Sequence, residues 1–316
     1  MTATTTLQAG TTDSPKLTRY REAERALFSA YGLAPTERFI DLAEPRLRLR
    51  ILEVGSGQPV IFLPGTGGTG PYWSPLLREL PGIRSILVDR PGWGLSSPVD
   101  YRDRDFGRLT AAILRGTLDA LGLDRVDLVG ASIGSLWTLW LSRYEPERVR
   151  RIIHLGGSPS VHIPVPRFFK ILTSPIGALI VRMPMSPKML RSQLEAIGHG
   201  ASLAEGKLDR FLPWRLAFAN ATSSMHHERA MAKALRVGDG WRPGFVPKDT
   251  DLSTFNHPVR MVFGSADPTG TVDLWREFAT GLPHGELEVV EGAGHMPWWD
   301  EPAAVGRSVR EFLTMG

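Results

Sequence analysis

The sequence predicts an α/β fold with a mostly parallel central sheet and helices on both of its faces. Apolar runs of strand length alternate with longer runs of helical periodicity in both end regions of the 316-residue chain. Several of these apolar runs lead into glycine-rich loops, at the edge where open parallel sheets place their functional groups. One domain of this kind with an inserted segment accounts for the chain length.

The N-terminal region is predicted to contain a tail, a helix and an edge hairpin. Residues 1–14 are rich in threonine and almost uncharged, which is typical of a disordered tail. Residues 16–31 have amphipathic spacing, and this helix could pack against the core, cover the inserted segment or form a homodimer contact. Residues 46–51 alternate polar and apolar side chains, and with the weaker candidate at 38–42 they predict an antiparallel hairpin at the sheet edge.

The other strands and helices alternate along the chain, except in its middle. We expect strands at 60–63, 83–89, 125–129, 149–155, 258–264 and 286–290, and helices at 106–121, 133–144, 272–282 and 303–313. Between about 158 and 251 the chain is rich in proline, methionine and arginine, with helix-like runs at 168–174, 187–197 and 230–237 and no strong strand. We therefore predict a core domain made of 15–157 and 252–316, and a helical cap made of 158–251.

Ser132 is the most informative residue for chemistry. It lies in the run Gly130-Ala131-Ser132-Ile133-Gly134, directly between a predicted strand and a predicted helix. This is the context of a nucleophile elbow, in which small neighbours make room for a strained serine. The Gly-x-Ser-x-Gly pattern alone also occurs by chance, so its weight comes from the strand and helix around it.

A serine nucleophile needs a base, and the base needs an orienting acid. Asp267 follows the predicted strand 258–264, and His295 follows the predicted strand 286–290 in a glycine-rich loop, 28 positions further on. Each alone is more often a turn acid or a surface histidine. Together with Ser132 they have the chain order Ser, Asp, His at three strand ends, which predicts a catalytic triad. The other seven histidines lie inside strands, in the middle segment or before strands.

A serine hydrolase also needs amides that stabilise an oxyanion. We assign the backbone N–H groups of Ile133, after the nucleophile, and of Thr66, in the glycine-rich loop 64–70. This loop also fits a dinucleotide fingerprint, with Asp89 as its acid, but that alternative gives the triad residues no role. A Walker loop is excluded because no Gly-Lys-Ser/Thr follows.

These segments together resemble the α/β-hydrolase fold family, in its serine-nucleophile branch with a helical cap. The matching segments are Leu63-Pro64-Gly65-Thr66-Gly67-Gly68, Val88-Asp89-Arg90-Pro91-Gly92-Trp93-Gly94-Leu95-Ser96, Gly130-Ala131-Ser132-Ile133-Gly134, Phe263-Gly264-Ser265-Ala266-Asp267-Pro268 and Gly292-Ala293-Gly294-His295-Met296-Pro297. The likeness covers roughly 37–315 apart from the middle segment. It implies a nucleophile at Ser132, an acid at Asp267 and a base at His295. Many relatives have His-Gly in place of Pro64-Gly65, and a glycine in place of Ser135.

The predicted cap supplies apolar side chains that could line an acyl or aryl pocket, namely Phe168, Phe169, Met183, Met185, Phe211, Trp214 and Phe218. Packing of the cap onto the core is the alternative role, and the more frequent one for apolar side chains. We select Gly65, Trp214 and Met296 as substrate contacts. Methionine-rich surfaces accept varied ligands, which favours a broad apolar pocket.

Composition excludes several classes of partner. The net charge of +4 comes from basic side chains spread along the chain and balanced by 33 acidic ones, so we expect no nucleic-acid binding. Arg90 could meet an anionic substrate or pair within the fold. The chain has no cysteine, which excludes disulfides and thiolate metal sites, and we expect no metal and no cofactor. We find neither a signal-peptide region nor a run that could span a membrane, which predicts a cytoplasmic protein.

The residues support three hypotheses about function. The first is hydrolysis of a carboxylic ester or related small acyl substrate through an acyl-enzyme. The second keeps the triad for carbon–carbon bond hydrolysis, lactone opening or perhydrolysis. The third is a ligand-binding protein on a hydrolase scaffold. The fold and the triad recur across many chemistries, so the sequence does not identify the substrate.

Overall fold

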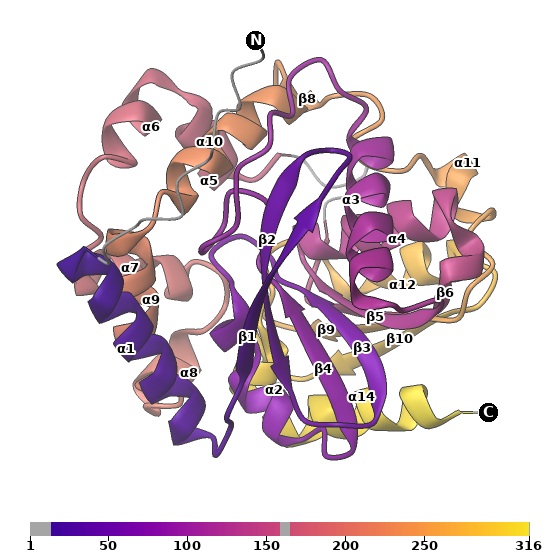
Figure 1. Cartoon of the computed structure of the whole chain (residues 1–316), viewed down its shortest axis with the longest axis horizontal. Helices are drawn as coiled ribbons and strands as arrows, with labels where there is room; N and C mark the ends of the chain where they lie inside the picture. The colour runs from indigo at the N-terminus through magenta and orange to yellow at the C-terminus, as the bar shows by residue number, and fades with distance from the viewer. Residues whose placement is uncertain (1–13, 159–164, 316) are drawn as a thin grey trace, which may run out of the picture.

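An eight-stranded sheet forms the centre of the computed structural model, which describes residues 14–158 and 165–315 (Figure 1). The strands lie in the order β1-β2-β4-β3-β5-β6-β9-β10. Strand β2 runs antiparallel to β1 and β4, and the strands from β4 to β10 pair in parallel. Their bounds are β1 Thr36–Leu42, β2 Leu47–Val54, β3 Gln58–Leu63, β4 Ile83–Val88, β5 Val126–Ala131, β6 Val149–Leu155, β9 Val259–Gly264 and β10 Gly285–Val290. The predicted mostly parallel sheet and its edge hairpin are confirmed.

Helices cover both faces of this sheet. Those outside the middle segment are α1 Pro15–Ala30, η1 Gly70–Trp73, α2 Ser74–Arg78, α3 Phe106–Leu121, α4 Ile133–Tyr144, η2 Pro146–Arg148, α12 Val272–Gly281, α13 Pro297–Asp300 and α14 Pro302–Thr314. Helix α3 has local start and stop signals, because the Asp105 side chain accepts a hydrogen bond from the Arg108 amide and Gly122 ends the helix at φ 66°. The short α2 was not predicted from the sequence, because five residues give too little periodicity.

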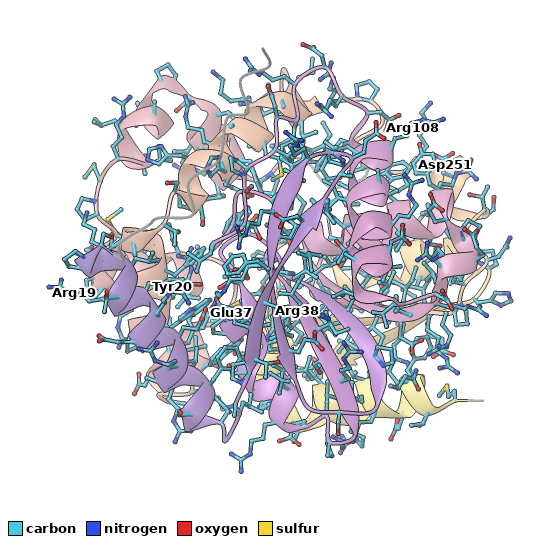
Figure 2. All side chains as sticks on the ribbon, viewed as in Figure 1. Arg19, Tyr20, Glu37, Arg38, Arg108 and Asp251 are labelled. Carbon is cyan, nitrogen blue, oxygen red and sulfur yellow. The ribbon has the colours of Figure 1, made fainter. Side chains whose placement is uncertain are left out.

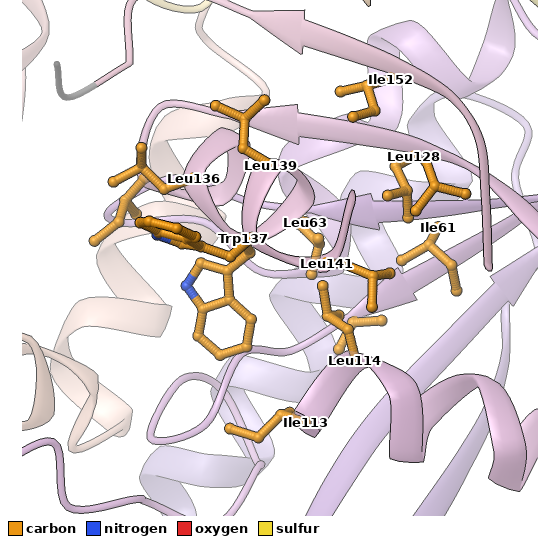
Figure 3. Packing of buried hydrophobic residues seen from close by; sticks show 14 of the residues in the cluster. Ile61, Leu63, Ile113, Leu114, Leu128, Leu136, Trp137, Leu139, Leu141 and Ile152 are labelled. Carbon is orange, nitrogen blue, oxygen red and sulfur yellow. The ribbon is translucent and has the colours of Figure 1, made fainter. Parts of the chain in front are cut away.

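Two hydrophobic clusters follow from the strand alternation. Neighbouring residues of β3, Ile61 and Phe62, belong to different clusters, as successive side chains of a strand point to opposite faces. Figure 3 shows the first cluster, in which Leu136, Trp137 and other residues of α4 meet α3 and the strands. The second cluster packs α1, α14 and part of the middle segment against the other face. The core thus fixes β5 and α4 rigidly, and with them the turn that joins the two.

The middle segment, between β6 and β9, consists mainly of short helices. Its elements are α5 Arg167–Thr173, α6 Pro175–Ile180, α7 Pro187–Glu195, α8 Gly200–Ala204, α9 Phe211–Ala221, α10 Ser224–Leu235, the short strands β7 Arg236–Val237 and β8 Gly240–Trp241, and α11 Asp249–Leu252. The sequence predicted α5, α7 and the second half of α10, and it missed the others. We call the elements α5 to α10 the insertion.

Helix α1 packs on the insertion and on the sheet. The ring of Tyr20 lies 5.9 Å from that of Phe218 in α9, and Tyr20 points from α1 into the molecule (Figure 2). The Tyr20 hydroxyl donates to Glu24, which forms an ion pair with the buried Arg50 of β2. The sequence left open where this helix packs. These contacts place α1 against both the insertion and the sheet. The predicted tail lies outside the described residues except for Ser14, whose side chain caps α1.

In the part of the chain that the structure describes, no helix combines the length and hydrophobicity needed to cross a bilayer.

Candidate active site

Ser132 occupies the sharp turn between β5 and α4. Its backbone has φ 50° and ψ −123°, a strained conformation for a residue with a side chain, which costs about 1–3 kcal/mol. A Cβ atom on Gly130 would lie 2.7 Å from the Ser135 backbone, and one on Gly134 would lie 2.0 Å from the Leu63 carbonyl oxygen. Only glycine fits on either side, so the turn requires the small residues that the sequence provides.

Asp267 and His295 are brought together at the ends of β9 and β10. Asp267 Oδ2 accepts a hydrogen bond of 2.8 Å from His295 Nδ1, and another of 2.8 Å from the Gly157 amide. Asp267 Oδ1 accepts from the amide and the hydroxyl of Thr269, at 2.9 and 2.7 Å. Both carboxylate oxygens are therefore held in place. With its proton on Nδ1, the imidazole has an unprotonated Nε2 that can accept another proton.

The two side chains shift the pKa values of one another. Burial raises the pKa of Asp267, but the charge of His295 and the hydrogen bonds outweigh burial, and the pKa lies below its ordinary value. Burial lowers the pKa of His295, but the charge and hydrogen bond of Asp267 outweigh it, and the pKa lies above its ordinary value. Asp267 thus stays ionised, and His295 is a stronger base than a free histidine.

The glycine-rich loop after β3 lies against the serine. A Cβ atom on Gly65 would be 3.0 Å from the Ser132 Cβ. The next residue, Thr66, is the one assigned to the oxyanion. Its hydroxyl donates a hydrogen bond of 2.7 Å to Glu228 in α10. The loop is therefore bound on one side by the elbow and on the other by the insertion.

Glu228 is a buried acid that the sequence analysis did not single out. Its Oε2 lies 3.9 Å from Arg90 Nη2, and this nitrogen donates to the Gly65 carbonyl oxygen at 3.1 Å. Burial raises the pKa of Glu228, against the opposing effects of Arg90, Thr66 and Trp93. Arg90 thus has partners within the fold, which is one of the two roles expected for it. No local pattern marks Glu228, because its role depends on the packing of a distant helix.

Arg215 of α9 is, after Arg90, a second buried basic side chain near this loop. Its Nη2 would lie 2.8 Å from a Cβ on Gly67, and its guanidinium carbon lies 5.3 Å from the centre of the Phe218 ring. Its Nη1 has no hydrogen-bond partner, and among residues 14–158 and 165–315 no carboxylate forms an ion pair with it. Burial lowers the pKa of Arg215 to about 10, so the side chain stays charged at neutral pH. An unpaired buried cation of this kind is suited to an anionic ligand.

The insertion also holds the loop that carries His295. The His295 amide donates to the Ile197 carbonyl oxygen at 2.9 Å. The fully buried His199 accepts from the Met296 amide through Nε2 at 3.1 Å, and its Nδ1 lies 2.9 Å from Asp300 Oδ1. Asp300 Oδ2 accepts from the Gly294 amide at 2.8 Å. This cluster fixes the residues on both sides of the imidazole.

The predicted substrate contacts have different surroundings. Gly65 lies beside Ser132, as described above. Trp214 is fully buried, stacks on Phe218 at 5.7 Å and directly precedes Arg215. Met296 is buried and follows His295.

Two of the apolar residues that could line a pocket are open to the solvent. Phe168 of α5 is 37% exposed, and Met183, which follows the end of α6, is 53% exposed. The dinucleotide alternative is also disfavoured, because Asp89 is fully buried, forms an ion pair with Arg50 and accepts from the Gly70 amide. Within the described residues, no group of three or more His, Asp or Glu side chains could hold a metal ion.

Comparisons with known proteins agree with this arrangement. A model of the alpha/beta hydrolase family matches residues 60–307. The chain is 27% identical over 293 residues to the 2-hydroxy-6-oxononadienedioate/2-hydroxy-6-oxononatrienedioate hydrolase 1 of Dechloromonas aromatica (strain RCB), over 89% of this chain and 96% of that relative. It is also 27% identical to the corresponding hydrolase 2 of Pseudomonas putida, over 89% of this chain and 97% of that relative.

Solved structures are similar in fold at lower identity. The carboxylesterase CesB from Bacillus subtilis matches with a TM-score of 0.72 and 18% identity, over 96% of this chain and 100% of that chain. The 2-hydroxy-6-oxo-6-phenylhexa-2,4-dienoate hydrolase from Rhodococcus sp. strain RHA1 matches with a TM-score of 0.73 and 19% identity, over 90% and 100%. The family model spans most of the sequence, and the fold is similar to that of the solved structures named above. The chain therefore belongs to the alpha/beta hydrolase family.

Proposed function

We propose that this chain is a serine hydrolase that cleaves a small acyl substrate through a covalent acyl-enzyme on Ser132. The observation that carries the proposal is the 2.8 Å hydrogen bond between His295 Nδ1 and Asp267 Oδ2, at the sheet edge that also carries Ser132. This bond orients the imidazole and leaves Nε2 as the proton acceptor for a serine hydroxyl. The strained turn at Ser132 supports the same role.

In the proposed reaction, Ser132 Oγ attacks the carbonyl carbon of the substrate while His295 takes the hydroxyl proton. The amides of Thr66 and Ile133 stabilise the negative charge that develops on the carbonyl oxygen. His295 then gives the proton to the leaving group, which departs. A water molecule repeats the attack on the acyl-enzyme, releases the acid and restores Ser132.

A carboxylic ester is the first candidate substrate, because its alkoxide leaving group needs only the proton that His295 carries. A fluorophosphonate probe is expected to label Ser132 and inactivate the protein, with the adduct located by peptide mass spectrometry. Ser135→Ala is the matched control, since Ser135 is a buried serine in the first turn of α4 whose hydroxyl has no partner among the described residues. Labelling at another residue, or turnover of p-nitrophenyl esters by Ser132→Ala at the rate of the unsubstituted protein, would contradict the proposal.

Carbon–carbon bond hydrolysis is the second candidate, and Arg215 favours it. The curated relatives named above are hydrolases of dienedioates and trienedioates, compounds that carry two carboxylates. A buried guanidinium with an unpaired Nη1 beside the oxyanion loop is a suitable partner for one of those carboxylates. Binding there would hold the substrate with its reacting carbonyl near Ser132.

The two candidates are separated by a substrate screen with an arginine variant. A 2-hydroxy-6-oxo-dienoate is compared with p-nitrophenyl acetate, and each is tested with Arg215→Met. If the carbon–carbon candidate is correct, kcat/KM for the dienoate exceeds that for the ester, and the substitution reduces only the former, roughly 30-fold or more. Ester turnover without dienoate turnover selects the first candidate. Lactone opening and perhydrolysis are tested in the same screen. Binding of a substrate without turnover, and without labelling of Ser132 by the probe, would support the third hypothesis, a ligand-binding protein.

A further inference from the structure

Exposed apolar side chains are concentrated on one part of the insertion. Among the described residues, eight large apolar side chains are exposed, and six of them fall between 168 and 183. These six are Phe168, Ile171, Ile176, Leu179, Ile180 and Met183, and we call them the apolar stripe. Ile176 and Leu179 are exposed at 68% and 62%. Soluble proteins rarely leave contiguous apolar surface of this kind without a partner.

Helical geometry places three of these side chains on one face of α6. Ile176, Leu179 and Ile180 have the spacing i, i+3 and i+4, and Met183 continues the spacing at i+7 in the turns that follow the helix. Hydrogen bonds from the amides of Arg182 and Met183 extend the turns beyond the end of α6. Figure 1 shows α6 at the outer edge of the molecule.

The backbone determines that this face is turned outward. A Cβ atom on Gly177 would lie 2.2 Å from the Leu172 carbonyl oxygen, so α6 packs against the end of α5 through its glycine. Leu172 is buried, whereas Phe168 and Ile171 lie on the exposed side of α5. The two helices therefore present their apolar sides to the solvent as one surface.

The surroundings of the apolar stripe are basic. The sequence contains no Asp or Glu between Glu147 and Glu195. The same stretch contains Arg167, Lys170, Arg182 and Lys188, of which three are exposed, and Lys170 lies 3.1 Å from Asp239. Arg229 and Arg236 approach from α10 and β7, and donate to the Ser174 carbonyl oxygen and the Thr173 hydroxyl.

We propose that α5 and α6 form a docking surface for a lipid bilayer with anionic headgroups. Apolar side chains that enter the headgroup region, with basic side chains around them, are the features that bind such a surface without spanning it. A second copy of the chain fits less well. A symmetric dimer through this face would bring the same basic groups of both copies together, and their mutual repulsion disfavours it, although Asp239 lies near Lys170 and Arg236.

The docking surface is connected to the candidate active site through α10. Glu228 accepts from the Thr66 hydroxyl, and the next residue, Arg229, donates to the Ser174 carbonyl oxygen between α5 and α6 at 3.2 Å. Consecutive residues of one helix thus contact the oxyanion loop and the docking surface. Lipid binding itself does not depend on the hydrolase proposal, because the apolar stripe contains no residue of the candidate active site.

Co-sedimentation with vesicles tests the inference. The full chain is mixed with vesicles of phosphatidylcholine alone, or of phosphatidylcholine and phosphatidylglycerol in equal parts. Three variants are compared: Ile176→Ser with Leu179→Ser, Arg167→Gln with Arg182→Gln, and Val237→Ser. Val237 is the matched control, since it is 61% exposed but lies outside the apolar stripe. Ser132→Ala is included to separate binding from turnover, and near-ultraviolet circular dichroism verifies that each variant is folded.

The unsubstituted protein, Val237→Ser and Ser132→Ala are expected to sediment with the anionic vesicles and to be released by high salt. The serine pair and the glutamine pair are each expected to reduce the bound fraction about fivefold or more. No sedimentation, equal sedimentation with neutral vesicles, or equal sedimentation of the serine pair would overturn the inference. A dimer in solution that the serine pair dissociates, without vesicle binding, would show that a second copy occupies the surface instead.

Discussion

The Thr66 hydroxyl donates a 2.7 Å hydrogen bond to Glu228, a residue 162 positions further along the chain. This contact joins the glycine-rich loop after β3 to helix α10 of the insertion. Glu228 is fully buried and Thr66 partly so, and the contact is reinforced by Arg90, which donates to the Gly65 carbonyl oxygen of the same loop. The backbone that we assign to the oxyanion thus depends on a side chain that is far away in sequence.

Glu228→Ala is expected to lower kcat by about 10-fold to 100-fold with little change in KM, because the loop loses its buried acceptor and Arg90 loses its nearest carboxylate. Glu228→Gln keeps an oxygen that can accept from Thr66 and should recover most of that loss. Steady-state kinetics on a soluble p-nitrophenyl ester provide the measurement. Glu195→Gln, at an exposed position of α7, is the control. An alanine variant with unchanged kcat would contradict the positioning role.

The raised pKa of His295 predicts the pH dependence of activity. The imidazole must be neutral to accept a proton, so kcat/KM should fall as the pH drops through a value above the ordinary 6.5. In Asp267→Asn the opposing charge is lost and burial dominates, so the pKa of His295 should drop below 6.5. Titration of the His295 imidazole by NMR in both proteins measures the two values. A pKa that is the same in both would show that Asp267 does not control the base.

The sequence allows the parallel strands and the positions just beyond them to be predicted. A parallel sheet brings the carboxyl ends of its strands to one edge, so Asp267 and His295 could be expected to lie close together. Arg215 and Glu228 could not be found in this way. Their helices pack across the sheet edge, and no local pattern reports which loop they meet.

The apolar stripe demonstrates a different limit of sequence reasoning. The spacing of Ile176, Leu179, Ile180 and Met183 indicates one helical face, but periodicity does not tell whether that face turns inward or outward. Its direction depends on the close packing of Gly177 against the Leu172 carbonyl. The sequence therefore left the role of Met183 open, and in the structure its side chain is 53% exposed.

His199 is expected to stabilise the loop around His295. His199→Ala would leave the buried Met296 amide without its acceptor, whereas Asp300 would keep its hydrogen bonds from the Gly294 amide and the Ser202 hydroxyl. Urea unfolding should therefore show a loss of about 1–3 kcal/mol, the cost of one unsatisfied buried group. His226→Ala, at an exposed position of α10, serves as the control and should change stability little. If both variants unfold at the same urea concentration, the cluster does not stabilise the loop.

Gly134→Ala is expected to be among the most damaging single-methyl changes in the chain. Its added Cβ would lie 2.0 Å from the Leu63 carbonyl oxygen, and neither backbone can move without shifting β3 or α4. Gly200→Ala adds the same methyl group at the start of α8, where nothing lies within 4 Å. This control should be neutral or stabilising by up to about 1 kcal/mol, because alanine favours a helix. Thermal unfolding followed by circular dichroism compares the two variants. A Gly134→Ala protein that melts at the temperature of Gly200→Ala would contradict the close packing of the elbow on β3.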